Sequence, residues 1–160
     1  ERAGAAVMAV TLGIRHAFGL FLQPMSTANG WSREVFALAI ASQNLVWGLV
    51  QPFTGMLADR LGAARVMIGG ALLYAAGLGL MAVAQTPGDL MLSAGLLVGL
   101  GLSGTTFAVV LGAVSRAVPE SQRTIAMGVA TGIGSFGQFA LLPGSLGLIE
   151  SLGWSGALLA

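Results

Sequence analysis

Long runs without a charged residue are the dominant pattern along this chain of 160 residues. Four such runs, each 23 to 26 residues long, cover residues 35–58, 66–88, 90–115 and 124–149. An α-helix needs about 20 apolar residues to cross the hydrocarbon core of a bilayer. The runs lack the alternation of apolar and polar positions that is typical of a membrane β-barrel. They therefore predict four membrane-spanning helices, over about 35–57, 66–86, 90–112 and 125–148.

The two ends of the chain predict further spans. Residues 4–25 form a fifth apolar stretch, and Arg15 and His16 in its middle argue against a cleaved signal peptide. A sixth span is expected to begin near Trp154. Because the chain begins at Glu1 without a Met and the sixth span is incomplete, we expect a fragment of a longer protein.

Composition narrows the class of protein. Charged residues make up 8% of the chain, against about 25% in ordinary soluble domains. Seven basic and six acidic residues leave a net charge of +1, too little for a nucleic-acid partner. The absence of Cys excludes disulfides and thiolate metal sites. We therefore expect an integral membrane protein in a lipid bilayer, with no nucleic-acid partner, cofactor or metal.

The charges between the spans indicate the orientation. If the spans alternate in direction, one side carries five arginines: Arg2, Arg60, Arg65, Arg116 and Arg123. The other side carries a single Arg together with three acidic residues: Arg33, Glu34, Asp89 and Glu150. Basic residues are enriched in cytoplasmic loops, so this bias predicts a cytoplasmic N-terminus.

Arg15 is the strongest candidate for a functional residue. A charged side chain in mid-bilayer costs at least about 2.5–3.5 kcal/mol, and no Asp or Glu lies in any predicted span. Its partner is therefore in sequence beyond this chain, or it is a ligand. Arg holds carboxylates through two parallel N–H bonds, which favours an anionic substrate. The alternative is that Arg15 extends to the membrane surface.

Other polar residues in the spans suggest a cavity between helices. The candidates for substrate binding besides Arg15 are His16, Gln43, Asn44, Thr105 and Gln138. His16 could respond to protons, and each of the others could instead form a hydrogen bond between helices. Small residues at spacings of four, Gly95, Gly99 and Ser103 and also Gly128 and Gly132, predict close helix packing.

The segment between the second and third predicted spans carries a recognisable motif. It reads Gly55-Met-Leu-Ala-Asp-Arg-Leu-Gly-Ala-Ala-Arg65-Val and resembles the GxLaDRxGxxR loop of the major facilitator superfamily, with Ala63 as a departure. The resemblance implies an all-α polytopic fold in which residues 1–160 form the N-terminal half. Such a half contains 3+3 inverted repeats, here five helices plus the start of a sixth, and pairs with a C-terminal half. It also implies secondary transport by alternating access.

The motif suits a gating loop. Gly55 and Gly62 allow close approach and a tight turn, while Asp59 can bind an Arg on its own side. Arg60, Arg65 and Arg116 are the candidates for that ion pair, which would stabilise one access state. The alternative is that these arginines only determine topology.

Three shorter segments narrow the resemblance. Residues 13–25, 30–33 and 43–48 are similar to bacterial transporters of monocarboxylates and of oxalate and formate. This implies a small organic anion as substrate and the bacterial inner membrane as location, with a coupling proton or counter-anion left open. Drug/proton antiport is disfavoured, because Gly95 replaces the expected Arg and Ile133 replaces the Pro of a Gly-Pro motif.

Two other functions remain as alternatives. Gly101-Leu-Ser103-Gly104 matches the GxSG of intramembrane serine proteases, but the only histidine is His16 in the first span. A membrane sensor that does not transport could also use this fold. We expect a transporter rather than an enzyme.

Overall fold

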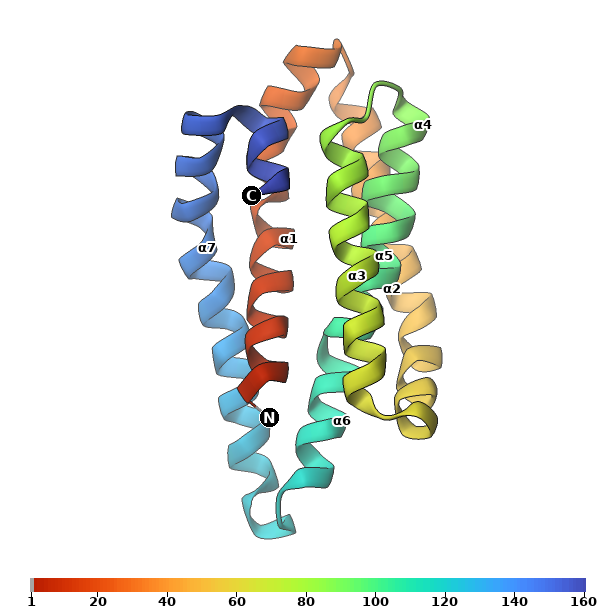
Figure 1. The fold of residues 1–160 in the computed structure, drawn as a ribbon, viewed down its shortest axis with the longest axis vertical. Coiled ribbons are helices and arrows are strands. Elements are labelled where there is room, and N and C mark those ends of the chain that lie inside the picture. Colours follow the sequence, from red (N-terminus) through yellow and green to blue (C-terminus); the bar gives the residue numbers. More distant parts are fainter. Residues whose placement is uncertain (1) are drawn as a thin grey trace.

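The computed structural model describes residues 2–160, which form an elongated bundle of helices with no strand in that range (Figure 1). The elements are α1 (Arg2–Asn29), α2 (Arg33–Leu61), α3 (Ala63–Ala82), α4 (Pro87–Leu90), the π-helix η1 (Met91–Leu97), α5 (Val98–Thr105), α6 (Phe107–Ala117), the 3-10 turn η2 (Glu120–Gln122) and α7 (Arg123–Leu159). Five stretches are long and apolar enough to cross a membrane: Ala3–Asn29, Arg33–Leu61, Ala63–Ala82, Pro87–Ala117 and Glu120–Leu159. The all-α polytopic fold class is therefore confirmed.

The helices form two groups that lie side by side. α1 packs along α7, while α2 and α3 pack against η1 and α5 of the fourth span (Figure 1). The N-terminus, the α2–α3 connection and the α6–α7 connection all lie at the same end of the bundle, drawn at the bottom of Figure 1. The helix ends that carry Arg60, Arg65, Arg116 and Arg123 are thus at one end, as the charge sorting requires. Which membrane side this end faces stays a prediction.

The connections between spans are short and chemically specified. Gly62 alone joins α2 to α3 with φ 91°, a conformation that favours glycine, and its N–H donates to Ala58 O at 3.0 Å. The fourth span begins with a capping box, in which Thr86 and Asp89 exchange hydrogen bonds of 2.9 and 3.1 Å. Both connections follow from local sequence.

The fourth span differs from the single regular helix predicted over 90–112. It is divided into α4, the π-helix η1, α5 and α6, and Thr106 between the last two pieces has extended backbone (φ −112°, ψ −158°). The hydropathy pattern reports only length and polarity, so it does not register these interruptions. Glycine-rich composition and back-bonding threonines both weaken a regular helix here.

The last span also ends in an interruption. α7 contains a non-helical Gly153 (φ 72°, ψ 170°), after which the chain turns back towards α1 and α3 (Figure 1). Beyond it, Ser155 Oγ donates to Ala82 O at 2.8 Å and Leu158 is buried in the main apolar cluster. This break lies where a sixth span was expected to begin, but the span itself stays a prediction.

Glycines allow two backbones to meet where α3 crosses α5. A Cβ added to Gly70 would lie 2.9 Å from Gly101 O and 3.0 Å from the Cα of Gly104. The predicted ladder at Gly95 and Gly99 is confirmed, because added Cβ atoms would lie 3.3 Å from Ser42 Cβ and 3.0 Å from Gln43 O, both in α2. In lipid, such close contact supplies the packing energy that holds helices together.

The second predicted ladder does not pack against any described residue. Added Cβ atoms at Gly128 and Gly132 would meet no atom of residues 2–160 within 4 Å. The close packing predicted at these two glycines is not seen among the described residues and stays a prediction, because spacing alone places them on one face of α7 without saying what that face meets.

Two adjacent glycines in α3 provide a test of the packing. Gly70→Ala should destabilise the bundle by about 1–3 kcal/mol, because the new methyl group overlaps the α5 backbone. Gly69→Ala should leave stability unchanged or raise it by up to about 1 kcal/mol, since a Cβ there meets no atom within 4 Å. Thermal unfolding midpoints in detergent measure both. Equal midpoints for the two variants would contradict the close α3–α5 contact.

Candidate functional site

Arg15 lies in the middle of α1, and its contacts are with α2. Its Nη2 donates to Asn44 Oδ1, and its Cζ lies 4.8 Å from the centre of the Trp47 ring. Its Nε is buried and has no hydrogen-bond partner within residues 3–160. A neutral amide and an aromatic ring compensate the charge only in part, so the guanidinium keeps the capacity to bind an anion.

Trp47 connects this cation to the fourth span. Its Nε1 donates to Thr106 Oγ1 at 2.9 Å, and the same hydroxyl donates to Leu102 O at 2.6 Å. On the other side, the buried Tyr74 of α3 donates to Thr11 O at 3.0 Å, one turn before Arg15. Side chains from α1, α2 and α3 and the break in the fourth span therefore meet around one arginine. We call Arg15, Asn44, Trp47 and Thr106 the central cluster.

Tyr74 was not predicted from the sequence, although it is the only tyrosine of the chain and lies within a span. Trp47 and Thr106 are among the polar residues of the spans that suggest a cavity, but they were not chosen as binding residues. Trp47 follows Asn44 by three residues, which places both on one face of α2. That spacing was the available signal.

Four predicted residues lie outside the central cluster. His16 is exposed, with Nδ1 3.0 Å from Leu12 O, because the residue next to Arg15 points about 100° away around the helix. Gln43 is fully buried and donates to Ala94 O at 2.9 Å, while Thr105 donates to Gly101 O at 3.0 Å. The hydrogen bond of Gln43 joins α2 to the fourth span, and that of Thr105 lies within α5. Gln138 is half-buried on α7, away from α2.

The serine of the protease-like motif is not arranged for nucleophilic attack. Ser103 is fully buried, and its Oγ donates to Leu100 O at 2.7 Å within its own helix. The ring of His16 contacts its own helix backbone instead of this serine. A serine nucleophile needs a base within hydrogen-bond reach, and no histidine supplies one here.

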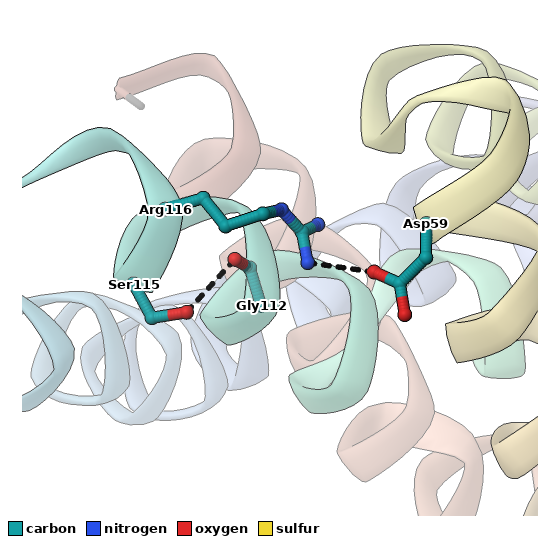
Figure 2. A network of polar contacts seen from close by, with 4 residues as sticks. All are labelled: Asp59, Gly112, Ser115 and Arg116. Atoms are coloured by element: carbon teal, nitrogen blue, oxygen red, sulfur yellow. Dashed lines mark hydrogen bonds and ion pairs between the residues drawn. The ribbon is translucent and has the colours of Figure 1, made fainter.

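The predicted ion pair of the gating loop is present, with Arg116 as the partner. Arg116 Nη1 lies 2.7 Å from Asp59 Oδ1, joining the end of α2 to the end of α6 (Figure 2). Gly112 and Ser115, on the same helix, are joined by a hydrogen bond of 2.9 Å. Both partners of the ion pair are more than half exposed, at 52% and 64%. Such a pair is weak and therefore easily exchanged.

The other residues of this loop take different positions. Arg60 and Arg65 are exposed, and neither forms an ion pair with another described residue. A Cβ on Gly55 would lie 4.0 Å from Ala108 Cβ, so α2 runs close to α6 there. Gly62 makes the tight turn described above.

Comparison with known proteins places the chain in a family. The family model described as Major Facilitator Superfamily matches residues 4–160. Multidrug resistance protein MdtH of Cronobacter sakazakii is 39% identical over 100 residues, which cover 62% of this chain and 24% of that protein. The MdtH protein of Yersinia pestis is 38% identical over 98 residues, which cover 61% and 24%. The matched segment is thus about a quarter of each relative's length.

These relatives support the broad resemblance and not the narrower one. Both are named for multidrug resistance, whereas the local segments resembled monocarboxylate transporters. The family model, however, covers nearly the whole chain, including the predicted gating loop and the five apolar stretches. The chain is an integral membrane protein and belongs to the major facilitator superfamily.

Proposed function

We propose that this chain is the N-terminal half of a twelve-helix secondary transporter that moves a small organic anion, such as a monocarboxylate, by alternating access. The observation that carries the proposal is Arg15, a cation in the middle of a span without a described carboxylate partner. Its location would be the bacterial inner membrane, with the N-terminus in the cytoplasm. A second half of the protein would complete the site.

The central cluster supports an anionic substrate. A carboxylate accepts two parallel N–H bonds from a guanidinium, one on each oxygen, and carries the opposite charge, whereas Asn44 offers a single neutral oxygen. In the low dielectric of the bundle, this exchange also neutralises the charge of Arg15. We propose that Asn44 holds the guanidinium ready until a carboxylate replaces it.

The ion pair between Asp59 and Arg116 supports a gating role for the loop. It joins α2 to α6 at the end of the bundle that we propose is cytoplasmic. Formation of the pair would stabilise one of two access states, and its loss would favour the other. Arg60 and Arg65 are free to bind groups of a second half in that scheme.

The second candidate function is drug export, which the names of the matched relatives favour. An exporter of cationic drugs would have little use for an arginine at its centre, because like charges repel. Dye efflux distinguishes the two functions. A complete protein that expels ethidium and does not take up lactate or oxalate would support drug export instead.

The anion proposal predicts a graded effect at Arg15. In membrane vesicles containing the complete protein, Arg15→Ala should lower uptake of radiolabelled lactate or oxalate at least about tenfold, because a charged hydrogen-bond donor is lost. Arg15→Lys should retain part of the activity, since it keeps the charge without the paired N–H groups. The matched control is Arg33→Ala, because Arg33 is an exposed arginine at the start of α2, at the end of the bundle opposite the α2–α3 connection. Wild-type uptake in Arg15→Ala would reject the assignment.

The gating proposal predicts compensation between two charges. Asp59→Asn should change the ratio of the access states by about 1.5- to 5-fold and slow transport, as expected for an exposed ion pair. Exchanging the charges through Asp59→Arg with Arg116→Asp should restore much of the rate. Glu34→Gln removes an exposed acid at the opposite end and should have no effect. If the exchanged pair is no faster than either single variant, the two residues do not act together.

A further inference from the structure

The fourth span is interrupted at a buried position, and neighbouring side chains compensate the interruption. α5 ends at Thr105, Thr106 is extended and fully buried, and α6 begins at Phe107. Carbonyl groups freed in such a break must be satisfied inside a membrane protein. Ser103 O accepts from Thr54 Oγ1 of α2 at 2.9 Å, and Leu102 O accepts from Thr106 Oγ1 at 2.6 Å. The break is thus supported by specific hydroxyl groups.

The piece before the break packs mainly on α2 and α3, whereas the piece after it contacts both helix groups. α5 is held by backbone contacts of its glycines with α2 and α3. α6 places Val110 and Val114 in an apolar cluster with Met8 of α1 and Ala130 of α7. α6 also carries Arg116, whose partner is Asp59. α6 also packs Val109 against Ala58 of α2 and Val66 of α3, so it lies between the two helix groups, as Figure 1 shows.

Trp47 contacts both this break and the cation of the central cluster. Its indole N–H donates to Thr106 Oγ1 at 2.9 Å, and its ring faces the Arg15 guanidinium at 4.8 Å. Asn44, one turn earlier on α2, accepts a hydrogen bond from the same guanidinium. Any movement of the guanidinium towards an anion changes what the Trp47 ring contacts.

We propose that Thr106 is a hinge of the fourth span and that Trp47 is the positioning residue that links Arg15 to it. The proposal rests on the proposed function, because an anion at Arg15 is the signal that it transmits. When a carboxylate draws the guanidinium away from the ring and from Asn44, Trp47 is released from one of its contacts and holds Thr106 less firmly. α6 then pivots against α5 and changes the position of Arg116 relative to Asp59.

The hinge can be tested without knowing the substrate. The complete protein, with any native cysteines removed, receives spin labels through Leu72→Cys on α3 and Ala117→Cys at the end of α6, both exposed positions. Double electron–electron resonance in lipid vesicles then reports the distances between the end of α6 and α3, which packs on α5. Thr106→Val, which removes the hydroxyl that accepts from Trp47, should change the ratio of distance populations by about two- to tenfold.

Three further variants separate the hinge from general damage. Trp47→Phe keeps an aromatic ring for Arg15 but removes the N–H, so it should reproduce the Thr106→Val change, and the double variant should add nothing. Arg15→Ala should shift the same populations. Thr131→Val removes a hydroxyl that donates only to Met127 O of its own helix α7, at 2.9 Å, and should leave the distances as in the wild type.

Each outcome decides the proposal. Wild-type distances in a folded Thr106→Val variant, judged by its elution profile, would overturn the hinge. If Thr106→Val and Trp47→Phe change the distances but Arg15→Ala does not, the link to Arg15 is overturned. With radiolabelled lactate as the probe, Thr106→Val should lower the maximal rate about two- to tenfold and change KM less than twofold. A wild-type protein that does not transport lactate or oxalate would defeat the proposed anion substrate, while the distance measurements would still test the hinge.

Discussion

The close approach of α3 to the fourth span is the contact on which the rest of this bundle depends. Lipid tails are as apolar as leucine, so helices in a membrane gain little from burying apolar surface and must gain from packing instead. Gly70, Gly101 and Gly104 supply that packing, because an added Cβ would lie 2.9, 2.7 and 3.1 Å from backbone atoms of the facing helix. α5 thus packs between α2 and α3. It is preceded by the π-helix η1 and followed by the break at Thr106.

Those deviations determine where polar chemistry occurs in the bundle. The π-helix before α5 offers the carbonyl of Ala94 to Gln43, and the break after α5 offers the hydroxyl of Thr106 to Trp47. Trp47 in turn faces Arg15, so the irregular backbone and the half-buried cation are parts of one network. In the hydrocarbon core of a membrane, no water is present to form hydrogen bonds with polar groups that the helices leave unpaired. Such groups therefore pair with one another and cluster in one place.

The two charged centres differ in how firmly they are held. Arg15 is half-buried, and its contacts are a neutral amide and a ring. The ion pair between Asp59 and Arg116 is exposed to water, which screens it. α6 is the element that reaches from the break beside the central cluster to this ion pair. In the proposed hinge, this helix is what links a change at Arg15 to the ion pair at the end of the bundle.

The spacing of charges was enough to predict four of the spans and their approximate limits, because the thickness of a bilayer and the cost of a charge within it act on sequence alone. The candidate ion pair came from the motif of residues 55–66. Gly62 was equally predictable, since a one-residue turn with positive φ favours glycine. The partner of Asp59 was left open among Arg60, Arg65 and Arg116, because the choice depends on where α6 ends in space. Likewise, only the tertiary structure showed that Thr106 rather than Thr105 contacts Trp47, and that Arg15 rather than His16 faces α2. Adjacent residues lie in the same apolar stretch of sequence but face different neighbours. Sequence thus determined which segments lie in the membrane, and the packing of those segments decided which polar groups meet.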